Sequence, residues 1–265
     1  MPPPRGLRPT GLVLVDKPAG RSSFAVVREL RRRTGARTGH AGTLDPFATG
    51  LLLVLSGSAT SLAPWLVGLD KRYVTEIDLT ARTSTGDPEG DIVEAREPPG
   101  EEELEHLLAG LRGDVELPIP AASAVKIGGE RAYRLARRGV AVEMPRRRSR
   151  VHALNVVSYT GDSVVLDARV SSGTYVRAIA DRLGGHCRAL RRTEVGPFRV
   201  EDASAIDSDE EPRIVPAAEA LAWLPSVEVS AEEARALRSG RRRGEEGVRY
   251  VSSGELVAVG RTVLP

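Results

Sequence analysis

The chain has 265 residues, of which 41% are hydrophobic and 28% charged, an ordinary balance for a globular protein with room for one large domain and a small one. Its single cysteine, Cys187, excludes an internal disulfide framework, and no apolar run approaches the roughly 20 residues of a membrane-spanning helix. The first residues lack the apolar core of a signal peptide, so we expect a cytoplasmic protein with no membrane partner.

The charges are unevenly distributed, although the net charge is only +2. Residues 1–50 carry nine Lys or Arg against three acids, and residues 131–150 carry eight against one. Residues 87–116, in contrast, carry eleven acids against two basic residues. Separate basic segments suit contacts to a phosphate backbone, whereas the alternative for each of them is a solvated surface.

The N-terminal part of the chain predicts a strand followed by a helix. Residues 12–15 form a short apolar run that stops at the turn-rich residues 16–20. Ser22 or Ser23 then caps a helix with apolar residues at helical spacing, which ends at Gly35. Taken without further information, Lys17 is a solvated residue of the turn.

The segment 39–50 is the stretch around which the chain is organised. Its glycines and its proline favour an ordered loop, and Pro46 biases the backbone of Asp45 toward an extended conformation. Residues 51–55 are continuously apolar, which is typical of a fully buried strand. A carboxylate on a stiff loop before such a strand is a candidate for chemistry, and the alternative is an ordinary Asp-Pro turn.

The rest of the chain predicts alternating strands and helices and a change of composition near its C-terminus. Helices are expected at 60–68, 101–112, from 173 onward and at 217–222, with strands at 71–81, 151–159 and 163–171. Residues 200–218 are acidic and contain proline, which is typical of a linker. Beyond them, short strands are expected at 227–229, 248–251 and 255–259, with a helix at 231–239.

The loop sequence His-x-Gly-Thr-Leu-Asp-Pro-x-Ala-x-Gly-x-Leu resembles the catalytic motif of the TruB family of pseudouridine synthases, which isomerise uridine 55 in the T loop of transfer RNA. The matching residues are His40, Gly42, Thr43, Leu44, Asp45, Pro46, Ala48, Gly50 and Leu52. The resemblance implies that Asp45 is the catalytic aspartate, as nucleophile or as base. It also implies that His40 helps to hold the target base out of its stack, and that Lys17 supports the active-site loop as part of the family's first motif.

Two further segments resemble motifs of this family. They contain Lys71, Tyr73, Thr83, Thr85, Asp87 and Gly90, and then Ser171, Gly173, Thr174, Tyr175 and Arg177. The resemblance implies that Tyr73 stacks on the uracil, that Arg177 pairs with Asp45, and that Tyr175 lines the same pocket. Without it, Tyr73 is a core tyrosine and Arg177 a surface arginine.

Residues 118–139 resemble the mobile RNA-clamping segment of the family, although Ile119 and Ala122 stand where the family has proline and tyrosine. Residues 185–189 are fewer than the family usually has before its Leu-Arg-Arg sequence. By the resemblance, Leu190 is the apolar residue near the base and Arg192 an RNA contact. Ala81 replaces a usual glycine.

The resemblance implies an α/β (α+β) pseudouridine synthase fold with a mixed, largely antiparallel sheet. We expect a catalytic domain at 1–220, with the RNA-clamping insertion at about 118–150, and a short β-rich PUA-like RNA-binding domain at 226–265. The expected substrate is the T arm and loop of tRNA, bound by a monomer. No cofactor and no metal are expected, because the scattered histidines and the single cysteine match no usual zinc site.

Two other classes of function compete with this hypothesis. One is a non-catalytic RNA-binding or tRNA-folding factor. Such a factor would not need a carboxylate that faces RNA phosphates, and the presence of Asp45, Tyr73 and Arg177 together argues against it. Nucleoside or glycoside hydrolysis at Asp45 would call for a paired acid, and the sequence offers no obvious one.

Overall fold

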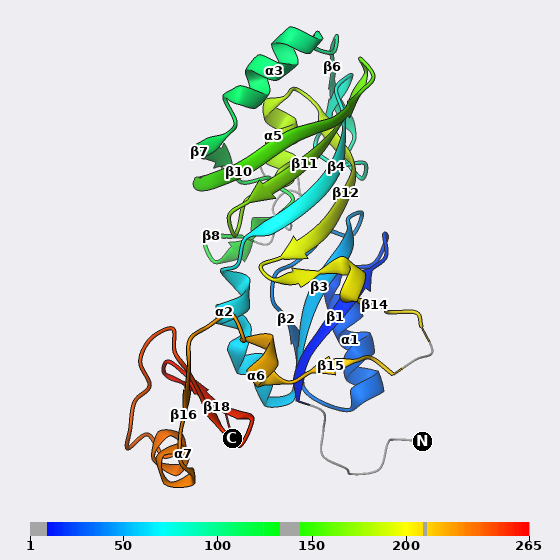
Figure 1. Ribbon diagram of the computed structural model, residues 1–265. Helices are drawn as coiled ribbons and strands as arrows, with labels where there is room; N and C mark the ends of the chain where they lie inside the picture. The colour runs from blue at the N-terminus through cyan, green and yellow to red at the C-terminus, as the bar shows by residue number, and fades with distance from the viewer. Residues whose placement is uncertain (1–9, 124, 133–143, 209–210, 265) are drawn as a thin grey trace. The chain divides into compact units, whose positions relative to one another are not determined.

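A computed structural model describes residues 10–123, 125–132, 144–208 and 211–264 (Figure 1). Its contacts divide the chain into two units. The first combines Met1–Val67 with Pro197–Pro265, and the second is Gly68–Gly196. Residues 124 and 133–143, which belong to the RNA-clamping insertion predicted at about 118–150, lie outside the described residues.

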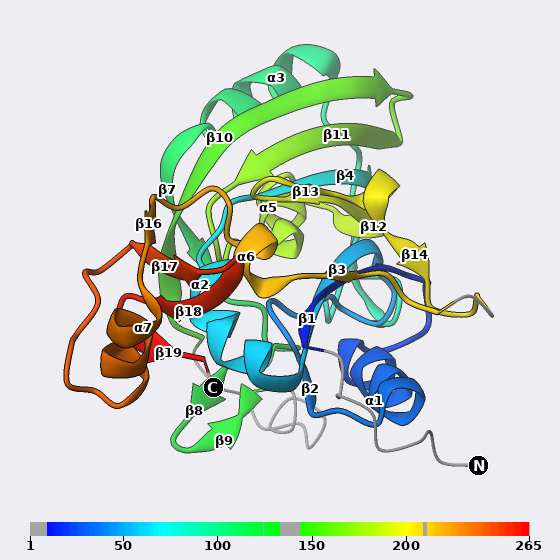
Figure 2. The same cartoon turned by 60° about the horizontal axis from the view of Figure 1, so that its bottom comes forward.

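The first unit is built on the antiparallel pair β1 (Gly11–Lys17) and β3 (Thr49–Ser56). The short β2 (Thr38–His40) pairs with β3. Most residues of β1 and β3 are buried, as their continuous apolar sequences predict. The helix α1 (Ser23–Thr34) packs against β2 and β3 (Figure 2), where Val26, Val27 and Leu30 are buried. Ser22 and Gly35 cap it as predicted.

The linker predicted for 200–218 is wrong. Two strands of this segment, β14 (Ser204–Ala205) and β15 (Ile214–Val215), pair with β1. Each strand has only two residues, which is too short to produce an alternating pattern in the sequence. The segment therefore completes the sheet that carries β1. Around it lie β13 (Phe198–Arg199), the 3₁₀ turn Val200–Asp202 and α6 (Ala217–Ala220).

The helix predicted at 60–68 is a 3₁₀ helix, Gly57–Leu62, followed by α2 (Ala63–Val67). The C-terminal part forms its own sheet in the order β16–β17–β18–β19, with α7 (Ala231–Arg238) packed on it. The strands are Ser226–Glu228, Arg249–Ser252, Glu255–Val259 and Thr262–Val263. The small β-rich C-terminal part is confirmed.

The second unit is an antiparallel sheet in the order β12–β4–β11–β10–β7. Its strands are His186–Val195, Lys71–Asp78, Ser163–Val170, Arg146–Tyr159 and Gly113–Pro118. Two small hairpins, β5–β6 (Ala81–Thr83, Ile92–Ala95) and β8–β9 (Lys126–Ile127, Glu130–Arg131), accompany it. Its helices are α3 (Glu101–Ala109) and α5 (Val176–Arg182), and α5 packs against β12.

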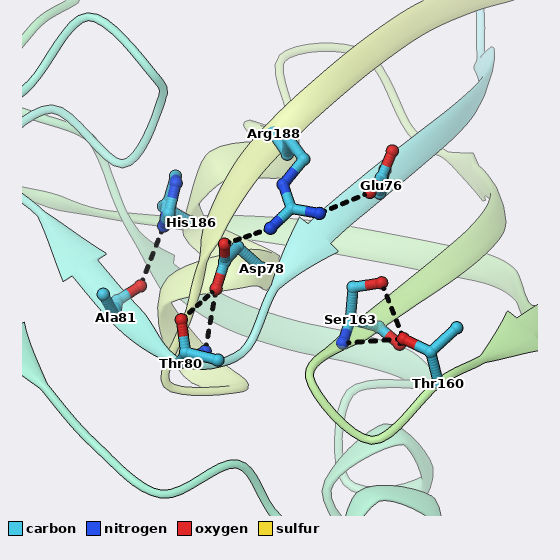
Figure 3. A network of polar contacts seen from close by, with 8 residues as sticks. All are labelled: Glu76, Asp78, Thr80, Ala81, Thr160, Ser163, His186 and Arg188. Carbon is cyan, nitrogen blue, oxygen red and sulfur yellow. Dashed lines mark hydrogen bonds and ion pairs between the residues drawn. The ribbon is translucent and has the colours of Figure 1, made fainter.

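Polar contacts fix the end of β4 to the start of β12 (Figure 3). One carboxylate oxygen of Asp78 accepts hydrogen bonds from the backbone nitrogen (2.9 Å) and hydroxyl (2.6 Å) of Thr80, and the other lies 2.5 Å from the Arg188 guanidinium. Arg188 also pairs with Glu76 at 2.9 Å. Although partial burial raises the pKa of Asp78, the hydrogen bonds from Thr80 and Arg188 outweigh it and lower that pKa.

A carboxyl group whose pKa is lowered by folding stabilises the protein above its unfolded-state pKa, and this contribution is lost as the pH falls through the folded-state pKa. We therefore expect Asp78→Asn to lower the free energy of unfolding at pH 7 and to have a smaller effect below about pH 4. Urea unfolding at both pH values measures the difference. The exposed Asp162, on the β10–β11 turn, gives the control Asp162→Asn. Equal effects of Asp78→Asn at the two pH values would contradict this account.

Candidate active site

The loop that carries Asp45 is fixed on both sides of that residue. The Ser23 hydroxyl, in the first turn of α1, donates to the Leu44 backbone oxygen (2.9 Å) and accepts from the Leu44 nitrogen (2.8 Å). On the other side, the Gly20 nitrogen donates to the Pro46 oxygen at 2.8 Å. Asp45 itself is half-buried. The backbone around this carboxylate is therefore held by residues that belong to another part of the sequence.

Lys17 is completely buried, so the alternative of a solvated turn residue is wrong. Its ammonium group donates to the backbone oxygens of Pro18 (2.8 Å), Arg21 (2.7 Å) and Pro46 (3.1 Å). Burying an ammonium group is costly unless its donors are satisfied, and backbone carbonyls provide the compensation here. Lys17 thus ties the turn after β1 to the residue that follows Asp45.

The third predicted residue of this unit, His40, ends β2 and is half-buried. Its register partner on β3 is Val54. Two residues further on, Gly42 adopts a φ of 103°, a backbone conformation that side chains rarely tolerate. The chain thus turns sharply between His40 and Asp45.

In the second unit, β4 and β12 bring three predicted residues onto one face of the sheet. Tyr73 lies opposite Arg192, and Thr75 lies opposite Leu190. Because side chains alternate along a strand, Tyr73, Leu190 and Arg192 project from the same side. All three are buried, with exposed fractions of 8%, 7% and 1%.

The segment after Gly184 does not disturb this arrangement, because β12 begins directly at His186 and its register shifts lie between Cys187 and Ala189 and between Arg192 and Glu194. Between these two shifts, the register is regular from Leu190 to Arg192.

Arg177 is 2% exposed, so the alternative of a surface arginine is also wrong. Its guanidinium forms an ion pair with Asp87 at 3.1 Å and donates to the backbone oxygens of Thr85 (2.7 Å) and Ala122 (2.9 Å). Ala122 contributes its carbonyl group, so this contact does not depend on the tyrosine usual at that position. The pairing of Arg177 with Asp45 would join the two units and stays a prediction.

Asp87 is a residue whose role the sequence analysis missed. Besides the ion pair, its other carboxylate oxygen accepts from the Thr85 hydroxyl (2.5 Å) and the Glu89 nitrogen (3.1 Å). It is 4% exposed. Asp87 stands in a motif that the sequence shows. Its partner Arg177 lies 90 residues away, so no local pattern indicates their pairing.

Tyr175 precedes α5 and is half-buried. Nearby in sequence, the hydroxyl of Ser172 accepts a hydrogen bond from Lys71 at 3.2 Å. Burial, together with the positive charges of Arg192 and Arg147, lowers the pKa of Lys71 to about 8. Lys71 also donates to the Leu69 backbone oxygen, so it links the start of β4 to the segment before Tyr175.

Within the described ranges, no group of three or more His, Cys, Asp or Glu side chains is placed to hold a metal ion. The same part of the chain contains no helix long and apolar enough to cross a membrane.

Comparisons with known proteins agree with the resemblance. Residues 29–176 match the model of the TruB family pseudouridylate synthase N-terminal domain. The tRNA pseudouridine synthase B of Thermobifida fusca (strain YX) is 44% identical over 257 residues, which cover 89% of this chain and 87% of the relative. The protein of the same name from Mycobacterium sp. (strain KMS) is 41% identical over 254 residues, covering 90% and 86%.

Among solved structures, a crystal structure of a Cbf5-Nop10-Gar1 complex matches with a TM-score of 0.69 at 23% identity, covering 96% of this chain and 79% of that one. This likeness supports the fold. The chain belongs to the TruB family of pseudouridine synthases. It is therefore an isomerase with the pseudouridine synthase fold.

Replacing Lys17 by Met keeps an unbranched side chain but removes every donor to the three carbonyl groups. We expect the free energy of unfolding to fall by about 1–3 kcal/mol or more, since buried acceptors lose their partner. Urea unfolding measures this loss. The control Arg21→Gln removes an exposed side chain that pairs with Asp207, and should change stability by less than about 1 kcal/mol. Equal losses in the two variants would contradict the bridging role of Lys17.

Asp87→Asn leaves the buried guanidinium of Arg177 without its charged partner, and we expect it to cost about 3–5 kcal/mol of stability. If Arg177 acts on the reacting group, turnover falls far more than RNA affinity in the protein that remains folded. Denaturant unfolding, single-turnover kinetics and RNA binding separate the two effects. Asp91→Asn changes an exposed carboxylate of the same loop and should affect neither. Full activity of Asp87→Asn would contradict the importance of the ion pair.

Proposed function

We propose that this enzyme isomerises uridine 55 in the T loop of tRNA, with Asp45 as its catalytic aspartate. The observation that carries the proposal is the fixation of Asp45 between Leu44 and Pro46 by Ser23, Gly20 and Lys17. A backbone held from both sides restricts the positions that the carboxylate can reach, which favours attack at a single carbon atom. The name shared by the bacterial relatives supports tRNA as the substrate.

The reaction moves the uracil without adding or removing atoms overall. The N1–C1′ glycosidic bond breaks, the base turns while it remains bound, and C5 bonds to C1′. The hydrogen on C5 then leaves as a proton, while N1 acquires one. Asp45 acts either as the nucleophile at C1′ or as the base that begins elimination at the sugar, and both routes need it ionised.

The buried face of β4 and β12 supplies the binding groups in this proposal. Tyr73 stacks on the uracil, an interaction worth about 1–3 kcal/mol for an aromatic ring and a base. Leu190 contacts the base, and Arg192 contacts the RNA. Arg177, which Asp87 and two carbonyl groups orient, pairs with Asp45 and keeps it ionised.

A base inside a folded T loop is reached only after it leaves its stack, which costs a few kcal/mol. We assign to His40 the filling of the space that the base leaves, and to Tyr175 the lining of the pocket. The proposed organisation is a catalytic domain at 1–220, with its RNA-clamping insertion at about 118–150, and a PUA-like domain at 226–265. We further propose that the enzyme acts as a monomer in the cytoplasm.

The proposal predicts that Asp45→Ala releases no tritium from tRNA labelled at C5 of uridine, whereas the wild type releases one equivalent for each tRNA. RNA affinity should change little, because a carboxylate facing phosphates does not contribute to binding. Tritium release and a binding titration on the same preparations measure both. Release by the variant would refute the role of Asp45. Absence of release by the wild type, with tight RNA binding, would favour a tRNA-folding factor.

A further inference from the structure

The outer face of α1 carries an aromatic ring and two arginines in line. Phe24, Arg28 and Arg31 are separated by four and three residues, so they lie on one face of the helix. All three are exposed, and the Phe24 side chain is 68% exposed. We call these three residues the α1 stripe.

Helix stability explains only part of this arrangement. Arginines in the last turn, Arg31 to Arg33, interact favourably with the negative end of the helix dipole. That effect does not extend to Arg28, in the middle of the helix, or to an exposed phenylalanine in the first turn. The single acidic residue of the helix, Glu29, is bound by Arg32 through two hydrogen bonds of 2.7 and 3.2 Å.

The stripe begins beside the loop that carries Asp45. Phe24 directly follows Ser23, whose hydroxyl holds both backbone groups of Leu44. Arg31 lies seven residues further along, about 10 Å away at 1.5 Å per residue. The stripe therefore runs away from the candidate active site, with its aromatic end nearest to it.

We propose that the α1 stripe binds the RNA strand that continues from the modified uridine, with a base stacked on Phe24 and phosphates bound by Arg28 and Arg31. The proposal rests on the proposed function, because it places the reacting uridine at Asp45. The charge of the stripe is complementary to a polyanion, and an aromatic ring next to cationic groups is the combination that binds single-stranded RNA without base-pair readout.

The first test removes the two charges. Arg28→Gln with Arg31→Gln keeps a good helix former at both positions. The control, Arg169→Gln with Arg182→Gln, also removes two exposed arginines. Ala168 is the register partner of Tyr73, so the next residue, Arg169, projects from the opposite face of the sheet. The dissociation constant of a full-length tRNA transcript is measured for the full chain at several salt concentrations.

Each lost phosphate contact should reduce the slope of log K against log salt by ~0.7–0.9. The stripe variant should thus have a slope smaller by ~1.5. The factor by which it binds more weakly than the wild type should therefore be about tenfold larger at ~50 mM salt than at ~200 mM salt. Thermal unfolding verifies that α1 is intact. A slope and affinity equal to those of the control pair would overturn the proposal.

The second test addresses stacking. Phe24→Leu keeps an apolar side chain without the ring, and Phe24→Tyr keeps the ring. We expect about fivefold or greater weakening for Phe24→Leu and wild-type affinity for Phe24→Tyr. Wild-type affinity of Phe24→Leu would exclude stacking and overturn that part of the proposal.

Tritium release separates the stripe from the function on which it rests. Release by the wild type, with unchanged RNA affinity in the stripe variants, would overturn the stripe alone. Weakened binding in the stripe variants without release by the wild type would overturn the placement of a reacting uridine beside the stripe.

Discussion

The buried ammonium group of Lys17 is the contact on which the geometry of the first unit depends. It joins three carbonyl groups from the turn after β1 and from the loop before β3, of which that of Pro46 lies 29 residues from Lys17. A charge in this position is stable only while every donor has an acceptor. The turn after β1 and the loop before β3 are therefore fixed relative to each other. Asp45 lies between Leu44 and Pro46, the two residues of this loop whose backbone groups are bound.

Arg177 has a comparable role in the second unit. Its charge is compensated by Asp87, and its Nη1 and Nη2 groups donate to the carbonyl groups of Thr85 and Ala122. A guanidinium bound in this way has one orientation, which is how an arginine acquires a precise function in a reaction. The two units thus use the same principle, in which a buried cation is held by backbone carbonyl groups.

The β4–β12 pair shows how a strand with an irregular register can keep its buried side chains on one face of the sheet. The register of β12 against β4 shifts between Cys187 and Ala189 and again between Arg192 and Glu194, and Leu190 and Arg192 lie in the regular stretch between the two shifts. A shift of one residue would have moved Leu190 and Arg192 to the other side of the sheet. This regular stretch keeps both side chains on the face of Tyr73.

By itself, the amino-acid sequence determined the family, the buried strands β1 and β3, the capped helix α1 and the identity of the candidate residues, because these depend on local periodicity and on one long motif. Only the tertiary structure decided that Lys17 and Arg177 are buried and that Asp87 is the partner of Arg177. It also decided that Ser204–Ala205 and Ile214–Val215 pair with β1. These features arise from pairings between residues far apart in the chain, and burial of a cation depends on partners that no local pattern reveals.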